Sequence, residues 1–238
     1  MTAYLDNSAT TKPCKGAKEN MLKAIDKCWG NPSSLHSAGI DADMLLIESR
    51  RVIAKTLACD EKEIVFTSGG TESNNIAVFG SAYQQRRKGN KIITSAIEHP
   101  SVHKCFDKLA DEGFEVVKIP VDSKGLIDLG ILEKEVDENT VLVSIMAVNN
   151  EVGTIEPVNE IRNIVKRKNS PAIIHVDAVQ VAFTQVCPRT SPSVAPQTVQ
   201  VLAVVQSASA KLCPRAFPSV APQTVQVLAV SQSASPHV

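Results

Sequence analysis

The stretch "AIIHVDAVQ", residues 172–180, is an apolar run that ends in a carboxylate, Asp177, followed three positions later by an amide, Gln180. Such a run between helical patterns is typical of a strand that is buried on both faces of a parallel sheet. Ligands of open α/β sheets bind beyond the carboxyl ends of the strands. We therefore expect Asp177 and Gln180 at a binding edge, with the alternative that Asp177 only caps a following helix.

The sequence before this strand alternates between strand and helix patterns. Short apolar runs such as "EIVFTS" (63–68), "KIITSA" (91–96) and "TVLVSIMAV" (140–148) follow amphipathic segments such as "DADMLLIESRRVIAKTLA" (41–58). This β/α rhythm predicts an α/β fold with a mostly parallel sheet and helices on both faces. Right-handed crossovers then bring the carboxyl ends of the strands to one edge.

The composition argues against several classes of protein. The 238 residues contain 25 basic and 25 acidic side chains without a block of like charge, which favours neither a nucleic acid nor a membrane surface as partner. The first residues lack the features of a signal peptide and no apolar run is as long as a membrane span, so we expect a cytoplasmic protein. The six cysteines include no C-x-x-C pair, so we expect neither a metal site nor a disulfide framework.

The composition changes abruptly beyond about Ala182, since every Asp, Glu and Gly lies before that point. The remainder holds two copies of a 26-residue segment, 187–212 and 213–238, in which "TVQVLAV" favours a strand. Two copies fall short of the three or more that a stable solenoid needs. We expect residues 1–182 to form one domain and residues 183–238 a repetitive tail that is no independent domain. A tandem duplication and a shifted reading frame are both open explanations.

Two polar motifs follow earlier predicted strands. "FTSGGTESNN" (66–75) places Gly70 and Thr71 between a strand and a helix, where backbone N–H groups and the helix dipole favour a phosphate. Plain helix capping is the alternative. "IEHPSV" (97–102) places His99 just after the next strand, where Pro100 favours an extended backbone. A lone histidine in such a place can also be purely structural.

A third motif, "AVNNEVGTIEP" (147–157), places Asn149 and Asn150 at the end of another strand. The alternative is a polar loop in which asparagine tolerates unusual backbone angles. Together the motifs bring a phosphate cradle, an imidazole, an amide and the carboxylate of Asp177 to one sheet edge. Pyridoxal 5′-phosphate needs such a set, because its phosphate, its ring face, its ring oxygen and its protonated ring nitrogen must all be held.

These motifs resemble, in order, those of cysteine desulfurases of the class V aminotransferase group, as do "YLDNSATT" (4–11) and "NPSSLHSAG" (31–39). The resemblance covers roughly residues 3–181. Selenocysteine lyases and other class V members share several of the motifs. The resemblance implies the large domain of a fold that binds pyridoxal phosphate, in a chain whose C-terminal part is truncated or altered.

The resemblance also implies roles for six residues. Carried over by position, Gly70 and Thr71 bind the phosphate, His99 stacks on the ring and assists proton transfer, Asn150 and Gln180 contact the ring oxygen, and Asp177 pairs with the ring nitrogen.

The family reaction converts L-cysteine to L-alanine and passes the sulfur to an enzyme cysteine as a persulfide, which requires a cofactor-bearing lysine and a mobile cysteine. The nearest relic of the lysine motif is "SASAKLCPRA" (207–216), which makes Lys211 the candidate lysine. Cys187 and Cys213 precede Pro-Arg and do not match the family's nucleophile context. We therefore expect a catalytically incomplete chain.

The resemblance implies partners as well. These are L-cysteine as substrate, a second copy of the chain in a homodimer, and a sulfur acceptor or iron–sulfur scaffold protein. A non-catalytic fragment that serves as a dimerisation or interaction module is the alternative to an enzyme.

Overall fold

The structure is a computed structural model that describes residues 3–57, 59–181, 198–203 and 226–229. The chain divides into two compact units, and their described parts are residues 3–64 in the first, and residues 65–181 with the last two strands in the second. Each unit is described by itself. No helix in the described residues is long and apolar enough to cross a membrane.

The first unit is helical in its described part. It contains α1 (Lys15–Lys27), α2 (Ser37–Leu57) and the short 3-10 helix η1 (Glu61–Glu63). Arg51 of α2 forms an ion pair with Glu61, with 3.2 Å between Nε and the carboxylate oxygen. This pair ties the end of α2 to η1, whereas α1 has no buried residue.

A seven-stranded sheet forms the centre of the second unit, in the order β1-β7-β6-β5-β4-β2-β3. Its strands are β1 (Ile64–Thr67), β2 (Lys91–Ser95), β3 (Glu115–Ile119), β4 (Thr140–Ser144), β5 (Ile173–Asp177), β6 (Thr198–Ala203) and β7 (Gln226–Ala229). The pairs from β3 through β2, β4, β5 and β6 to β7 are all parallel. The predicted α/β fold with a mostly parallel sheet is confirmed.

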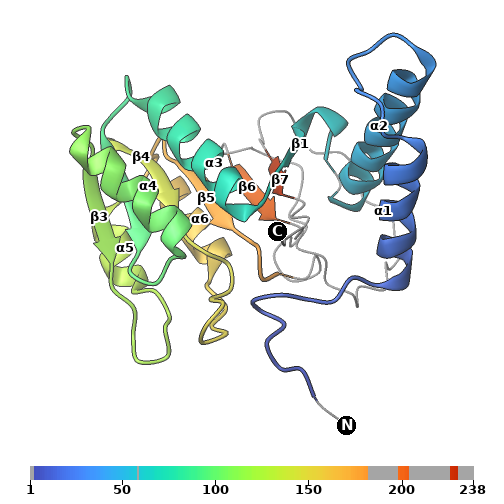
Figure 1. Cartoon of the computed structure of the whole chain (residues 1–238). Coiled ribbons are helices and arrows are strands. Elements are labelled where there is room, and N and C mark those ends of the chain that lie inside the picture. The colour runs from blue at the N-terminus through green and yellow to red at the C-terminus, as the bar shows by residue number, and fades with distance from the viewer. Residues whose placement is uncertain (1–2, 58, 182–197, 204–225, 230–238) are drawn as a thin grey trace. The chain divides into compact units, whose positions relative to one another are not determined.

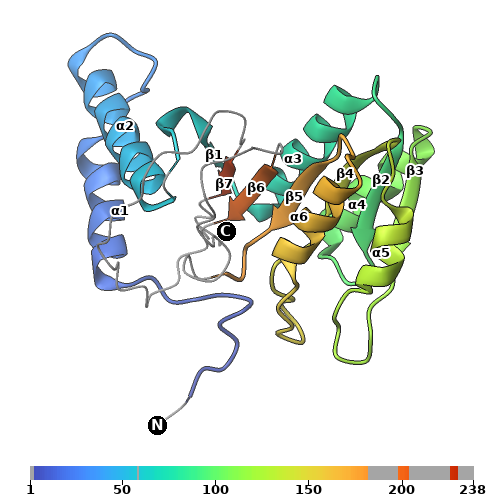
Figure 2. The same ribbon diagram turned by 180° about the vertical axis from the view of Figure 1, so that it is seen from behind.

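Helices cover both faces of this sheet (Figures 1 and 2). They are α3 (Gly70–Gln85), α4 (Pro100–Asp111), α5 (Leu129–Glu135) and α6 (Val158–Arg167). Side chains alternate along β5, so Ile173 packs in one core cluster with α3 and α4, whereas Ile174 and Val176 pack in the other with α5 and α6. The run 172–178 is mostly apolar because helices cover both of its faces.

The two copies of the tail repeat supply neighbouring strands of the same sheet. β6 pairs with β5, and β7 pairs with β6 so that Gln200 lies opposite Gln226 and Val201 opposite Val227. These partners are 26 residues apart, which is the repeat length. Equivalent positions of the two copies therefore face each other, while the expected domain limits, 1–182 and 183–238, stay a prediction.

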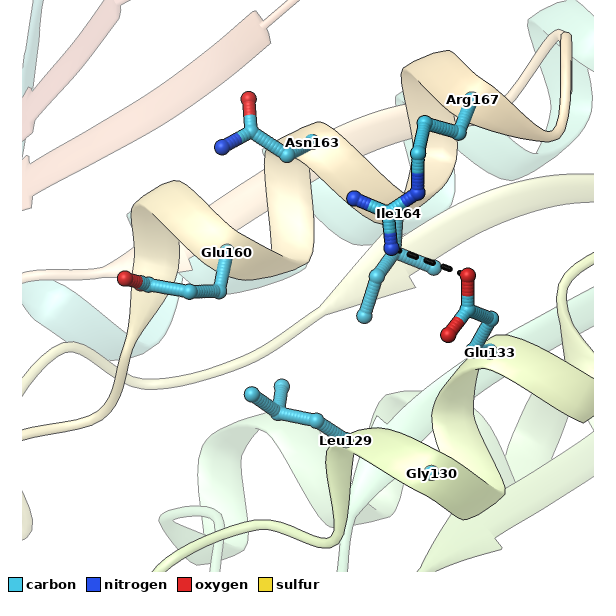
Figure 3. Close-up of a pocket in the computed structure, with 7 residues that line it drawn as sticks. All are labelled: Leu129, Gly130, Glu133, Glu160, Asn163, Ile164 and Arg167. Carbon is cyan, nitrogen blue, oxygen red and sulfur yellow. Dashed lines mark hydrogen bonds and ion pairs between the residues drawn. The ribbon is translucent and has the colours of Figure 1, made fainter.

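A shallow hollow of about 270 Å³ lies between α5 and α6 (Figure 3). Arg167 of α6 and Glu133 of α5 form an ion pair beside it, with 2.9 Å between the charged atoms. The other lining residues are Leu129, Gly130, Glu160, Asn163 and Ile164. Among the described residues, none of the site residues predicted from the sequence lines this hollow.

Candidate functional site

The parallel register brings the carboxyl ends of β2, β4 and β5 to one edge of the sheet. The backbone N–H of Ala147, just beyond β4, donates to the carbonyl oxygen of Asp177 at 2.9 Å. The Nδ2 group of Asn149 donates to the carbonyl oxygen of Ile97 at 3.0 Å. These two bonds hold together the three segments that carry Asp177, Asn150 and His99.

Asp177 ends β5 and is nearly buried, with 5% of its surface exposed. Its Oδ1 accepts the backbone N–H of Val179 at 3.1 Å, and its Oδ2 accepts from Nδ2 of Asn74 on α3 at 2.9 Å. The first contact is a local turn, but the second joins β5 to a helix 103 residues away. A helix N-cap, the alternative considered from the sequence, does not account for the second contact.

Asn74 and Ser101 connect Asp177 to His99. Besides its bond to Asp177, Nδ2 of Asn74 donates to Oγ of Ser101 at 2.8 Å. Oγ of Ser101 lies 2.8 Å from Nδ1 of His99, which also accepts the backbone N–H of Ser101 at 3.1 Å. A hydrogen-bonded path therefore runs from the end of β5 through α3 to the residue that caps α4. We name these four residues, His99, Ser101, Asn74 and Asp177, the polar relay.

The N-terminus of α3 carries the predicted phosphate residues, Gly70 and Thr71. Its N-cap is Gly69, which has no side chain to bond the first-turn N–H groups. Ser68 instead donates to Oε2 of Glu72 from both its backbone N–H, at 2.6 Å, and its hydroxyl, at 2.7 Å. These hydrogen bonds lower the pKa of Glu72. The N-cap residue thus bonds none of the first-turn N–H groups through a side chain, and such groups are the ones that bind anions at helix N-termini.

Asn150 and Gln180 are half-buried near the same edge. Asn150 stands in the turn after β4, whose shape is set by Asn149, because Oδ1 of Asn149 accepts the backbone N–H groups of Glu151 and Val152. Gln180 follows Asp177 by three residues. Neither side chain belongs to the polar relay, and their contacts to a ring oxygen stay predictions.

The predicted lysine, Lys211, lies outside the described residues, as do Cys187 and Cys213. Among the described cysteines, Cys14 is exposed, Cys28 and Cys59 are half-buried, and Cys105 is buried. Burial raises the pKa of the Cys105 thiol to about 11, which disfavours the thiolate that a nucleophile needs.

Glu98 is a buried carboxyl group that the sequence reasoning missed. Its Oε1 accepts from the hydroxyl of Ser95 at 2.5 Å and from the backbone N–H of Met146 at 2.8 Å. Burial is the main cause that raises the pKa of Glu98 to about 8, and the nearby charge of Asp177 adds to it. Glu98 is therefore mostly a neutral acid at neutral pH.

His175 is fully buried two residues before Asp177. Its Nδ1 lies 2.7 Å from Oγ of Ser144. Burial lowers the pKa of His175 to about 4, although the charge of Asp177 acts in the opposite direction. The imidazole is consequently neutral, and its contact with Ser144 links β5 to β4.

The residues missed by the sequence reasoning stand inside the motifs that it selected. Asn74 lies in "FTSGGTESNN", Glu98 and Ser101 lie in "IEHPSV", and His175 lies in "AIIHVDAVQ". The one signal for Asn74 is its spacing, since it follows Gly70 by four positions, about one helical turn.

Comparison with known proteins identifies relatives of this chain. The profile of the family described as aminotransferase class-V matches residues 3–187. A NifS/IcsS protein homolog of Lactobacillus delbrueckii subsp. bulgaricus is 49% identical over 178 residues, which are 74% of this chain and 46% of the relative. The cysteine desulfurase IscS of Dictyoglomus turgidum is 44% identical over 177 residues, 74% of this chain and 44% of that protein.

The solved structure of a NifS-like protein superposes with a TM-score of 0.73 at 45% identity, and the match covers 76% of this chain and 50% of that one. The chain thus spans less than half the length of these two curated relatives.

Glu98→Gln is expected to flatten the dependence of stability on pH. Because the pKa of Glu98 rises from 4.5 to about 8 on folding, the folded state binds the proton more tightly, and the free energy of unfolding falls as pH rises between these values. The slope from this group approaches about 1.4 kcal/mol per pH unit. Glutamine does not titrate, so the variant lacks this slope. The pH dependence that His175 contributes is the same in both proteins.

Urea denaturation of both proteins across this pH range measures the difference, with Glu138→Gln, an exposed glutamate, as the control. An unchanged slope in Glu98→Gln would contradict the buried neutral acid.

Proposed function

The chain belongs to the aminotransferase class-V family, and we propose that it is the cofactor-binding part of a cysteine desulfurase that binds pyridoxal 5′-phosphate. The observation that carries the proposal is the polar relay, which connects a nearly buried carboxylate, Asp177, through Asn74 and Ser101 to a histidine, His99, at the carboxyl edge of the sheet. The activity of complete relatives is part of the proposal, because the chain spans only part of them.

Asp177 fits the protonated ring nitrogen of the cofactor. A carboxylate has about four lone-pair positions, and two N–H donors from the described residues occupy them here. Room for a further donor therefore remains on Asp177. Since only 5% of its surface is exposed, pairing with a positive charge is weakly screened by water.

The N-terminus of α3 fits the phosphate. The uncapped first turn at Gly70 and Thr71 offers backbone N–H groups, and the helix dipole favours a negative charge there. The bond from Asn74 to Asp177 lies one turn further along the same helix, so the phosphate site and the carboxylate are joined by one rigid element.

His99 would stack on the ring and move protons at the reacting carbon, while Asn150 and Gln180 would hold the ring oxygen. When bound, pyridoxal phosphate supplies an electron sink that stabilises negative charge developing on the substrate. The contribution of this chain is to keep the ring oriented and its nitrogen protonated.

The proposed substrate is L-cysteine, whose sulfur the family reaction passes to an enzyme thiol with release of L-alanine. The sequence after Gln180 offers only Lys211 for the lysine role, in a relic of the family motif. No described cysteine is both exposed and placed in the second unit, because Cys105 is buried there. We therefore propose a chain that binds the cofactor but is catalytically incomplete.

The proposed partners are a second copy of the chain and a sulfur acceptor or iron–sulfur scaffold protein, in the cytoplasm. One observation favours the second copy. Leu22 and Ile25 lie on one face of α1, with Trp29 just beyond the helix, and between 49% and 74% of each residue is exposed. Exposed apolar residues grouped in this way indicate an interaction surface. This surface also suits the alternative function, a dimerisation module without catalysis.

Asp177→Asn is expected to weaken the binding of pyridoxal phosphate at least about tenfold, because an amide does not stabilise a protonated ring nitrogen in a dry site. Titration followed by cofactor absorbance measures the affinity, and the variant should also lose the spectrum of the protonated ring. Asp107→Asn, which removes an exposed aspartate paired with Lys118, is the control. Equal affinities and spectra for Asp177→Asn and the unaltered chain would show that Asp177 holds no cofactor.

The unaltered chain is expected to release alanine from L-cysteine orders of magnitude more slowly than a complete enzyme, since covalent catalysis and the attacking thiolate are both compromised. Alanine production by the purified chain with added cofactor measures this rate. Turnover that disappears in Lys211→Ala would overturn the prediction and identify Lys211 as the lysine.

Ile25→Glu is expected to shift the chain from dimer to monomer, because a charge on the exposed face of α1 opposes burial of that face. Sedimentation velocity measures the change, and Lys23→Glu, which places the same side chain elsewhere on the helix, is the control. A monomeric unaltered chain would contradict the proposed homodimer. A dimer that binds no pyridoxal phosphate would favour the interaction module.

A further inference from the structure

We propose that Asn74 is a positioning residue, which fixes the orientation of Asp177 and, through Ser101, places the proton of the His99 ring on Nε2. The inference rests on the proposed function, since it assigns to Asn74 the arrangement of the two side chains that would face the cofactor ring.

The donors and acceptors of the polar relay allow only one direction. A carboxylate only accepts, so the atom of Asn74 that faces Asp177 must be the amide nitrogen, Nδ2. The amide has two hydrogens, and the second points to Oγ of Ser101. Oγ of Ser101 accepts from Asn74 and still carries its own hydrogen, which can point to Nδ1 of His99.

The backbone N–H of Ser101, which can only donate, also points to Nδ1 of His99, at 3.1 Å. Both contacts of Ser101 thus favour Nδ1 as an acceptor. In the neutral imidazole the proton then stands on Nε2. The site would thus present an N–H group, and not a lone pair, at the free end of the ring.

Two members of the polar relay, Asn74 and Ser101, are buried, whereas His99 is exposed. Asn74 is 1% exposed and Ser101 is 7% exposed, whereas the His99 ring is exposed at the edge of the sheet. Hydrogen bonds out of water are electrostatically stronger and fix side-chain orientation more firmly. The exposed ring of His99 is therefore oriented by its bond to the buried Ser101, which Asn74 bonds in turn.

α3 gives Asn74 a rigid support. Ala77 and Val78, in the next turn of the helix, lie in the core cluster that also contains Val102 and Phe106 of α4. Asn74 thus joins two packed helices to the end of β5, and a shift of its amide would move both Asp177 and Ser101. No group in the described residues bonds Oδ1 of Asn74, so the bonds of Nδ2 alone set the amide plane.

The test is nitrogen-15 NMR of the histidine rings in the full chain without cofactor. In the unaltered chain, Nδ1 of His99 should resonate as an unprotonated nitrogen and Nε2 as a protonated one. Asn74→Ala, which removes no hydrogen-bond partner of His99, should shift both resonances part of the way toward the average of the two tautomers, because the backbone N–H of Ser101 still donates to Nδ1. Ser101→Ala should shift them in the same direction, and the double variant should add little, because both changes interrupt one path.

Two controls separate positioning from a loss of structure. His103 lies one turn further along α4, and its resonances should stay in place in both variants. Asn163→Ala, on the exposed face of α6, should change nothing at His99. Should Asn74→Ala fail to fold, Ser101→Ala alone decides, since unchanged His99 resonances in a folded Ser101→Ala chain would overturn the relay.

A second measurement concerns the cofactor. Asn74→Ala should weaken pyridoxal phosphate binding at least about tenfold, as expected for losing a buried hydrogen bond to a charged group. If the unaltered chain binds no cofactor but the His99 resonances respond as described, the proposed function fails and the relay stands. If the chain binds the cofactor and neither the resonances nor the affinity responds to Asn74→Ala, the relay is overturned and the proposed function stands.

Discussion

A nearly buried carboxylate needs hydrogen-bond donors, and Asn74 with the backbone of Val179 supplies them to Asp177. The rest of the site depends on this constraint. The donor on α3 must reach the end of β5, so the helix has to pack on the face of the sheet to which Asp177 points. The same packing places the uncapped N-terminus of α3 and the cap of α4, His99, at the same edge.

The ionisable groups around the edge divide into charged and neutral ones. Burial keeps Glu98 in its acid form and His175 in its neutral form, and for His175 it outweighs the opposing charge of Asp177. Asp177 differs from Glu98 in its partners, since two N–H groups reach separate oxygens of its carboxylate. With Glu98 and His175 neutral, Asp177 is the carboxylate of these three buried groups that the proposed function pairs with a protonated ring nitrogen.

The sequence predicted the parts of this arrangement that have a linear signal. Strand runs such as "AIIHVDAVQ" revealed β5, and the position of Asp177 and His99 after strands placed both at the edge. Asn74, Ser101 and Glu98 were missed, because their importance arises from contacts across the fold, and the helical spacing of Asn74 from Gly70 does not show which partner it reaches. Asn149 and Asn150 were equivalent in sequence, yet only the structure shows that Asn149 shapes the turn. The predicted strand character of "TVQVLAV" is seen in β6, but its place beside β5 could not be read from composition.

The in-register pairing of β6 with β7 makes equivalent positions of the two repeat copies neighbours in the sheet. Each paired residue has its own duplicate as its neighbour, so a substitution in one copy changes the surroundings of the same position in the other. The two copies are therefore not free to diverge independently along their paired strands. The six positions at which they differ all lie outside the segments 198–203 and 224–229, where the two sequences are identical.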